Sequence, residues 1–309
     1  MGRKRKGRSV HGWVVVDKPA GATSTSVVGR VKRTFDAAKA GHGGTLDPFA
    51  TGLLPIALGE ATKTVSYVME GPKSYRFTVR WGVATETDDP EGAVVRTSEV
   101  RPSVAAIEGA LAGFVGEIEQ VPPAYSAVKI AGERAYDLAR AGEKPEIAPR
   151  RVLVHVFRLL EAVSEEEARF EVQCGKGTYI RALARDLALA LGTVGHLVQL
   201  RRTAVGPFTE EDAISLDLLD DLGHTPAEQQ RILLPVEAAL DGIPALSLTE
   251  GEAGRLRNGQ AVSLLRKVDL TRIAGLSEGD TVLAMNAGQP VALTRYSRGE
   301  VQPMRVLNI

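Results

Sequence analysis

Residues 41–52 read Gly41-His42-Gly43-Gly44-Thr45-Leu46-Asp47-Pro48-Phe49-Ala50-Thr51-Gly52, and this stretch predicts a tight loop around one carboxylate. Its glycines allow backbone conformations closed to other residues and let another molecule approach the main chain. Pro48 fixes the backbone after Asp47 and favours an extended conformation for Asp47 itself. The loop can therefore hold one carboxylate, the His42 imidazole and several N–H groups in a fixed relation. A turn in which Asp47 makes only a local hydrogen bond is the alternative. A P-loop is excluded, because its G-x-x-x-x-G-K-[ST] spacing is absent.

Length and composition predict one large domain followed by a small one. The chain has 309 residues, of which 44% are hydrophobic and 25% are charged, as in ordinary soluble globular proteins. No apolar run approaches the ~20 residues that span a membrane. The formal net charge is zero, so any affinity for nucleic acid must come from local basic patches. The single cysteine, Cys174, excludes an intramolecular disulfide framework and a cysteine-rich zinc site, which suits a reducing cytoplasm.

Residues 1–10 are predicted to form a basic, flexible tail. No apolar segment follows the basic residues, so the tail is not a secretory signal. It is either simply solvated or makes a loose contact with nucleic acid.

Hydrophobic periodicity predicts alternating strands and helices over the first hundred residues. Strands are expected at 13–16 and 53–58, a helix capped by Thr23 or Ser24, and another helix over 60–68. Strict alternation over 73–81 predicts a strand that places Tyr75 on one face with the apolar residues. The plain interpretation of Tyr75 is a core aromatic. The loop 85–92 is acidic enough for a metal site, although a polar hairpin end explains it equally well and the EF-hand spacing is absent.

The middle of the chain combines basic and aromatic residues. A helix starting at Ser103 is followed by a basic region, 124–151, in which Tyr125 and Tyr136 are interleaved. Such a mixture suits an RNA backbone with stacked bases, although exposed charge alone is common. The basic residues of this region are Lys129, Arg134, Arg140, Lys144, Arg150 and Arg151.

Strands are expected next at 152–159 and 169–174, and they lead into Gly175-Lys176-Gly177-Thr178-Tyr179-Ile180-Arg181. Thr178 is predicted to cap a helix that Gly192 ends. Its N-terminus, beside Lys176 and Arg181, suits a phosphate group. An ordinary capped helix with surface charges is the alternative.

The C-terminal part predicts a small, mostly β domain from about Ile243. Before it come a strand-like segment at 196–205 and short helical patterns up to Leu240. Thr249 and Glu252 form a capping box for a short helix. Apolar segments at 281–285, 291–296 and 304–309, separated by turns, are expected to be strands.

Seven segments, taken in order, resemble one family. They are Asp17-Lys18-Pro19-x-Gly21-x-Thr23-Ser24, the 41–52 loop, Gly59-Glu60-Ala61-Thr62-Lys63, Tyr75 in its strand, PPAYSAVK at 122–129, KGTYIR at 176–181 and LRRT at 200–203. Spread over about Trp13 to Phe208, they resemble the bacterial tRNA pseudouridine-55 synthases of the TruB family. Gly43 departs from the pattern, because many relatives carry threonine there. Glycine keeps the loop permissive and leaves the expected chemistry intact.

The resemblance implies an α+β fold, the pseudouridine-synthase fold, with a central mixed, mainly antiparallel sheet flanked by helices. The catalytic domain would cover 11–240 and carry an RNA-contacting insertion around 122–151. Residues 243–309 resemble the small, β-rich PUA-type RNA-binding domain on fewer features.

The resemblance also implies a reaction. The uridine at position 55 in the T loop of tRNA is flipped out, detached from C1′ of its ribose and re-attached through C5, without oxidation and without any cofactor or metal. By motif position Asp47 is the catalytic carboxylate, and carboxylates act as nucleophile or base at a sugar. Tyr75 packs on the base and is a candidate acceptor for the C5 proton. Arg181 pairs with the catalytic aspartate and keeps it ionised. Whether Asp47 attacks C1′ or first acts as a base is left open.

Four further residues match positions that contact the RNA. Tyr179 and Leu200 match the lining of the base pocket, and His42 matches a histidine at the point where the base leaves the stack. Lys18 is carried over as a substrate-binding residue, in either a structural or an RNA-facing role.

The expected partner is the T stem-loop of tRNA, bound by a cytoplasmic monomer without an obligate protein partner or a membrane. One alternative is an RNA-binding or tRNA-folding protein of the same fold without turnover, which intact Asp47, Tyr75 and Arg181 argue against. Another is a guide-RNA-dependent pseudouridine synthase, which the short N-terminus and the small C-terminal domain argue against.

Overall fold

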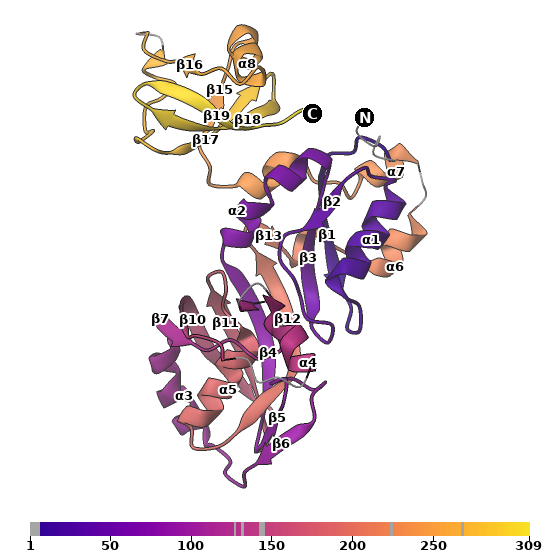
Figure 1. The fold of residues 1–309 in the computed structure, drawn as a ribbon, viewed down its shortest axis with the longest axis vertical. Coiled ribbons are helices and arrows are strands. Elements are labelled where there is room, and N and C mark those ends of the chain that lie inside the picture. The colour runs from indigo at the N-terminus through magenta and orange to yellow at the C-terminus, as the bar shows by residue number, and fades with distance from the viewer. Residues whose placement is uncertain (1–6, 127, 131–132, 142–145, 223–224, 267–268) are drawn as a thin grey trace.

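A mixed sheet runs through the larger part of the molecule (Figure 1). The computed structural model describes residues 7–126, 128–130, 133–141, 146–222, 225–266 and 269–309. Over these residues the sheet runs in the order β14-β1-β3-β12-β4-β11-β10-β7, with β2 beside β3 and β13 beside β12. Its strands are β1 (Gly12–Lys18), β2 (Ala40–His42), β3 (Thr51–Leu58), β4 (Lys73–Trp81), β7 (Gly116–Gln120), β10 (Arg150–Ala162), β11 (Glu167–Cys174), β12 (Gly195–Val205), β13 (Phe208–Thr209) and β14 (Ala213–Ser215). Only the β1–β14 and β3–β12 pairs are parallel, so the prediction of a mixed, mainly antiparallel sheet is confirmed.

Helices cover the two halves of this sheet. α1 and α6 pack on β1 and β3, whereas α3 and α5 pack on β4, β10 and β11 (Figure 1). The helical segments are α1 (Ser24–Thr34), α2 (Val65–Glu70), α3 (Val104–Leu111), α4 (Ala135–Arg140), α5 (Ile180–Ala190), α6 (Leu216–Asp221) and α7 (Pro226–Gln230), with 3₁₀ turns η1 (Gly59–Lys63), η2 (Ala112–Phe114), η3 (Glu210–Asp212) and η4 (Val236–Leu240). Thr23 caps α1 by accepting a hydrogen bond from the Ser26 N–H, and the valine stripe of α1 is buried as its spacing predicts.

The prediction of a single helix over 60–68 is wrong, because the structure has the two short segments η1 and α2 there. Thr64 separates η1 from α2, with φ −102° and ψ 0°. Its buried hydroxyl donates to the Ala61 carbonyl, 2.8 Å away. A local hydrogen bond of this kind competes with the helical pattern, and the chain turns there instead of continuing.

A second sheet follows, in the order β15-β17-β18-β19-β16. Its elements are β15 (Ala245–Ser247), α8 (Glu250–Arg257), β16 (Val262–Ser263), β17 (Thr281–Asn286), β18 (Gln289–Ser297) and β19 (Glu300–Val306). The predicted capping box of Thr249 and Glu252 is present at α8. The last strand begins and ends earlier than the predicted 304–309. Two short hairpins, β5 (Val83–Thr85) with β6 (Val94–Thr97) and β8 (Lys129–Ile130) with β9 (Glu133–Arg134), complete the described strands.

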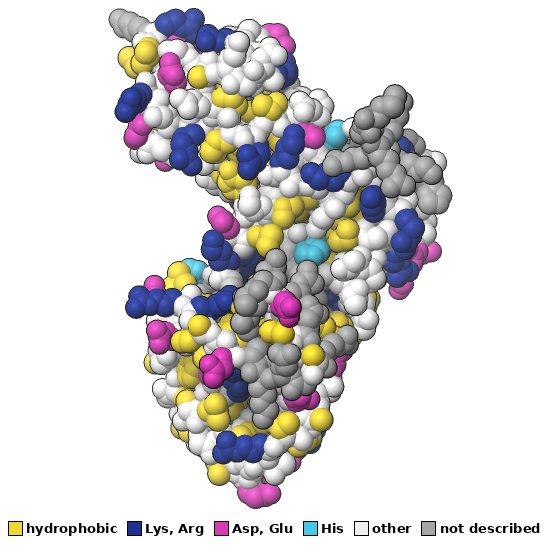
Figure 2. All heavy atoms as spheres, viewed as in Figure 1, with side chains coloured by type: hydrophobic (Ala, Val, Ile, Leu, Met, Phe, Trp, Pro, Cys, Tyr) yellow, Lys and Arg dark blue, Asp and Glu magenta, His cyan; other side chains and the backbone are white. Residues whose placement is uncertain are grey.

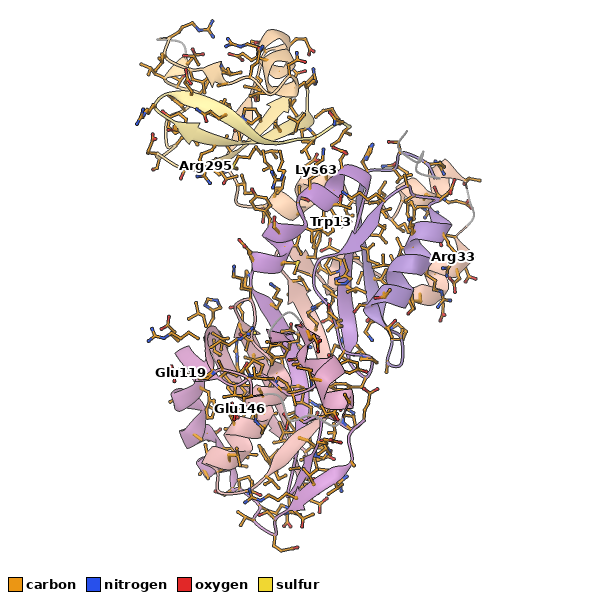
Figure 3. All side chains as sticks on the ribbon, in the orientation of Figure 1. Trp13, Arg33, Lys63, Glu119, Glu146 and Arg295 are labelled. Carbon is orange, nitrogen blue, oxygen red and sulfur yellow. The ribbon has the colours of Figure 1, made fainter. Side chains whose placement is uncertain are left out.

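The second sheet is anchored to the first through η1. Lys63 lies at this junction (Figure 3), where its ammonium donates to the Val306 carbonyl at 2.7 Å and to Glu60. The Glu60 carboxylate also accepts the N–H of Asn308 at 2.9 Å. Beneath these contacts Leu307 shares an apolar cluster with Trp13. In the described residues, no helix is both long and apolar enough to cross a membrane.

Candidate active site

A cleft of about 1590 Å³ opens beside β4 and β12. It is larger than the ~300–1,000 Å³ usual for small-molecule pockets, so it has room for part of a polymer. Five segments line it: the catalytic loop (residues 41–52), α2 with the start of β4, the acidic loop 85–92, the insertion and the 175–181 segment. The residues predicted from sequence that line it are Asp47, Tyr75, Tyr179, Arg181 and Leu200.

The catalytic loop is fixed by side chains from other elements. Ser24, at the start of α1, donates to the Leu46 carbonyl at 3.0 Å and accepts the Leu46 N–H at 2.9 Å. The ammonium of Lys18 in β1 donates to the Pro48 carbonyl at 3.1 Å. These contacts hold the backbone on both sides of Asp47, so its carboxylate has a defined place before any substrate arrives.

Arg181 joins Asp47 to two other segments. Its Nε lies 3.0 Å from Asp47 Oδ2. Nη1 donates to the Thr87 carbonyl at 3.0 Å and lies 3.3 Å from Asp89 Oδ2, while Nη2 donates to the Tyr125 carbonyl at 2.9 Å. The Arg181 side chain is only 6% exposed, whereas that of Asp47 keeps 35%. A substrate in the cleft can therefore reach the carboxylate, while its arginine partner is held behind it.

The charge state of Asp47 reflects opposing forces. Burial raises the pKa of the Asp47 carboxyl above its ordinary value, and the nearby Arg181 charge opposes that rise. The negative charge of Asp89 pushes the pKa of Asp47 up again. A partly covered carboxylate that is oriented by a guanidinium and reachable from the cleft suits a nucleophile or base.

The acidic loop 85–92 forms the end of the β5–β6 hairpin, as one of the two interpretations of its sequence predicted, but two of its carboxylates are covered. Asp88 and Asp89 turn inward: Asp88 Oδ2 lies 3.2 Å from Arg185 Nη1, and Asp89 faces Arg181. Burial raises the pKa of Asp88 to about 6. Within the described residues no group of three or more His, Cys, Asp or Glu side chains could hold a metal ion. The sequence analysis missed the pairing of Asp88 and Asp89 with arginines, since those arginines are almost a hundred positions away.

Tyr75 lies on β4 directly opposite Arg202 of β12. The two side chains therefore share one face of the sheet with Leu200. Burial raises the pKa of the Tyr75 phenol, and the Arg202 charge opposes the rise. Tyr75 borders the cleft as well as the core, so it is more than the core aromatic of the plain interpretation.

Tyr179 occupies the N-cap position of α5, where Thr178 was expected. Its N–H donates to Gln120 Oε1 at 2.8 Å, and its carbonyl accepts from Gln120 Nε2 at 3.1 Å. Thr178 instead donates to the Gly175 carbonyl at 3.1 Å. The N-cap prediction for Thr178 is wrong, because the Gln120 side chain satisfies the backbone at this helix end.

The phosphate site expected at 175–181 loses one of its two cations. Arg181 is turned inward to Asp47 and is nearly covered. Lys176 is exposed and forms a surface ion pair with Glu70 at 3.2 Å. Lys176 therefore remains available to an RNA phosphate, whereas Arg181 is not.

His42 lies at the end of β2, beside the cleft and outside its lining. Its Nδ1 accepts the N–H of Gly44 at 3.3 Å. Burial, with a smaller effect of the Arg202 charge, lowers the pKa of the imidazole. The His42 imidazole is thus mainly neutral at neutral pH, and it lies next to the cleft-lining residue Gly44.

Lys18 does not face RNA. Its side chain has no exposed surface, and its ammonium donates to the carbonyls of Pro19, Ala22 and Pro48 at 2.8 to 3.1 Å. Burial lowers the pKa of Lys18 to about 8. The substrate-binding role given to Lys18 is corrected to a structural one, because a covered ammonium that supports the catalytic loop cannot contact a substrate here.

Gly43 is explained by space. A Cβ at this position would lie 2.8 Å from Cγ1 of Val68 in α2, closer than real contacts allow. The glycine lets α2 pack tightly against the loop.

The basic insertion is described only in part. Arg150 and Arg151 border the cleft, and so do Tyr125 and Tyr136, whose rings meet edge to face at 6.0 Å. Residue 144, the side chains at 129, 134 and 140, and residues 1–6 of the basic tail lie outside the described part.

Two family profiles match the chain. The profile described as TruB family pseudouridylate synthase (N terminal domain) matches residues 32–180. The profile described as tRNA pseudouridylate synthase B C-terminal domain matches residues 181–241, so it ends before the second sheet.

Whole-chain relatives agree with these profiles. Proteins named tRNA pseudouridine synthase B from Rhodospirillum rubrum and Caulobacter sp. (strain K31) are 58% and 51% identical, each over 100% of both chains. Among solved structures, a chain of a Cbf5-Nop10-Gar1 complex matches with a TM-score of 0.73 at 28% identity, covering 96% of this chain and 85% of that one. The predicted pseudouridine-synthase fold is confirmed.

Proposed function

The chain belongs to the TruB family of pseudouridylate synthases, and on that premise we propose that it converts a uridine of tRNA to pseudouridine. We assign the reaction to the T-loop uridine at position 55, with Asp47 as the catalytic carboxylate. The observation that carries this assignment is the 3.0 Å Asp47–Arg181 pair inside a cleft of about 1590 Å³. No other carboxylate in the resembling motifs combines such a fixed backbone with access from the cleft.

The cleft suits a base removed from its stack. Extruding a base costs a few kcal/mol, least from a loop, and stacking on aromatic rings returns ~1–3 kcal/mol. Tyr75 of β4, Tyr179 at the start of α5 and Leu200 of β12 all line the cleft. These side chains would receive the flipped uracil while Asp47 faces its ribose.

The isomerisation must break the C1′–N1 bond, join C1′ to C5, release the C5 hydrogen as a proton and place a proton on N1. Asp47 acts at the ribose, either as nucleophile at C1′ or as base. Arg181 keeps its carboxylate oriented and favours the ionised form. Acceptance of the C5 proton by Tyr75 requires the phenolate, which the Arg202 charge favours and burial disfavours.

RNA binding would extend beyond the cleft. Figure 2 shows a hollow between the second sheet and the lower body, with Lys and Arg side chains on both sides of it. We assign residues 243–309 to RNA binding as a PUA-like domain, and residues 11–240, with the insertion, to catalysis. The enzyme would work as a cytoplasmic monomer without guide RNA, protein partner or cofactor. The 58% identity to a tRNA pseudouridine synthase B favours this over the guide-dependent alternative.

Tritium release tests the proposal. The purified chain alone should release tritium from unmodified tRNA labelled at uridine C5, because the new glycosidic bond displaces that hydrogen. A matched tRNA with cytidine at position 55 should release far less tritium than the first tRNA. Absence of release from the first tRNA, with the chain folded and binding it, would refute the function. Equal release from both tRNAs would refute the assignment to position 55.

A further inference from the structure

Arg202 is a buried cation that sequence reasoning assigned no role. Its side chain lies in the middle of the large sheet and is 1% exposed. It forms no ion pair with a carboxylate in the described part of the chain, unlike Arg181 and Arg185. An unpaired buried charge is expensive, so its retention calls for a role in the site beside it.

The guanidinium instead binds backbone carbonyls on both sides of Asp47. Nη2 donates to the Gly44 carbonyl at 3.0 Å and Nη1 to the Thr45 carbonyl at 3.3 Å. Nε donates to the Leu53 carbonyl at 2.8 Å. One planar group therefore ties the start of the catalytic loop to the beginning of β3, with Asp47 between the two attachments.

Glycines make this arrangement possible. Gly52 has φ +101°, and a Cβ there would lie 2.1 Å from the Arg202 carbonyl oxygen. Gly44 has φ +131°, a conformation that other residues rarely adopt. The glycines of the catalytic loop and the arginine of the LRRT motif thus fit one another, although they lie some 150 positions apart.

The same residue reaches the other side of the site. Arg202 is the cross-strand neighbour of Tyr75, and its charge acts on the phenol of Tyr75 and the imidazole of His42. Both residues were expected at the base-flipping site. The Arg202 side chain therefore contacts the loop that carries Asp47, and its charge also acts on Tyr75 and His42.

We infer that Arg202 is the positioning residue of the site, which holds the Gly44–Leu53 loop so that Asp47 meets the ribose while Tyr75 meets the base. It touches neither reacting atom. The inference rests on the proposed function for its consequence in turnover, and on the structure alone for its consequence in the loop. Lysine cannot replace it, because an ammonium on a flexible stem lacks the planar fork that reaches three carbonyls.

The test compares Arg202→Lys with Arg201→Lys. Arg201 is the adjacent residue of β12, but it points to the opposite face, where it pairs with Asp17 and Glu210. Single-turnover and steady-state tritium release, tRNA affinity, thermal unfolding and amide hydrogen exchange of residues 44–53 are measured for both variants and the natural chain.

Arg202→Lys should lower kcat about 10²-fold, as expected when a reacting group is misplaced by ~1 Å, and change KM less than about threefold. Exchange of the loop amides should rise at least about tenfold, while core strands stay protected. Arg201→Lys should stay within about twofold of the natural chain in both readouts. Near-natural turnover together with unchanged loop exchange in folded Arg202→Lys would overturn the inference.

Two additional readouts keep the test decisive. If Arg202→Lys does not fold, Arg202→Gln, which keeps a planar amide without the charge, replaces it. The imidazole pKa of His42, followed by NMR, should then rise because the neighbouring positive charge is gone, and an unchanged value would contradict the placement. If the natural chain itself releases no tritium, the proposed function fails, whereas loop exchange still supports or overturns the positioning role.

Discussion

Two clusters of arginines and carboxylates in this molecule have the same chemistry and opposite behaviour. In the cleft, Asp47 and Asp88 face Arg181 and Arg185, and burial raises the pKa of both carboxyls. Between β16 and β17, Asp269 binds Arg266 and Arg272 at 2.7 to 3.2 Å, and hydrogen bonds, chiefly from Arg266, lower its pKa to about 2. Hydrogen bonds make the difference, because Asp269 accepts them from two guanidinium groups, whereas Asp47 meets only Nε of Arg181, at 3.0 Å.

This contrast distinguishes the cleft cluster, which we assign to catalysis, from the Asp269 cluster, which joins neighbouring segments of the chain. Charges that are paired but poorly hydrated raise the energy of the folded state, and sites of chemistry are where such arrangements persist. Charges held by several hydrogen bonds mainly join local segments, and here Arg272 links Glu252 at the start of α8 to Asp269. The four substitutions below address the two clusters, from the largest expected effect to the smallest.

Asp47→Asn should cause the largest loss. The amide is nearly isosteric, so the loop held by Ser24, Lys18 and Arg202 should keep its shape, but the amide is neither nucleophile nor base. Tritium release should fall at least ~10³-fold, while tRNA affinity changes little. Asp220→Asn, at a surface pair with Arg30, is the matched control and should keep full turnover. A rate near that of the natural chain in Asp47→Asn would reduce Asp47 to a turn residue.

Arg181→Lys should lower turnover about 10²-fold with a much smaller loss of binding, because a lysine cannot span three segments at once. The weaker hold on the carboxylate should also raise the pKa of Asp47 further. Turnover requires the ionised carboxylate, so the acid limb of kcat/KM should move to higher pH. An unshifted limb with natural turnover would show that the pair is incidental.

Asp89→Asn separates charge from geometry. Removing the negative charge beside Asp47 should lower the pKa of Asp47, so the acid limb should move to lower pH, opposite to Arg181→Lys. The weakened contact to Arg181 should reduce the plateau rate by roughly tenfold. Both effects are read from one pH–rate profile, and a shift to higher pH would contradict the assigned like-charge repulsion.

Asp269→Asn should leave turnover within about twofold and lower the midpoint of thermal unfolding at neutral pH. The sign follows from linkage: a depressed carboxyl pKa stabilises the folded state above pH 3.8, and that contribution is lost as pH falls through about 2. The difference in unfolding midpoint between variant and natural chain should therefore vanish near pH 2. A loss of turnover at unchanged stability would mean that the second cluster takes part in catalysis.

Local patterns predicted the elements better than the site. β4 covers Lys73–Trp81 as its alternation indicated, and the capping box at Thr249 is present, because both depend on neighbours within a few positions. The pairing of Asp47 with Arg181 came from the resemblance and not from spacing. Thr178 failed as a cap because Tyr179 takes the N-cap position, where its backbone N–H donates to Gln120, 59 positions away.

The missed residues depend on distant partners. Asp88, Asp89 and Arg185 look like ordinary surface charges until the acidic loop folds against α5. Arg202 left a usable signal, because two adjacent arginines in a strand must point to opposite faces and one of them then faces the core. Which carbonyls it would meet was beyond the sequence, since they belong to a loop that only the fold brings near.

Carboxyl ¹³C NMR titration of the free protein tests the contrast between the clusters most directly. The resonances are assigned with Asp47→Asn, Asp88→Asn and Asp269→Asn. In one spectrum series Asp47 should titrate above 3.8 and Asp88 near 6, while Asp269 should titrate near 2. Titration of all three carboxyls together, close to 3.8, would contradict the claim that burial raises the pKa of the cleft carboxyls while hydrogen bonds from two arginines lower that of Asp269.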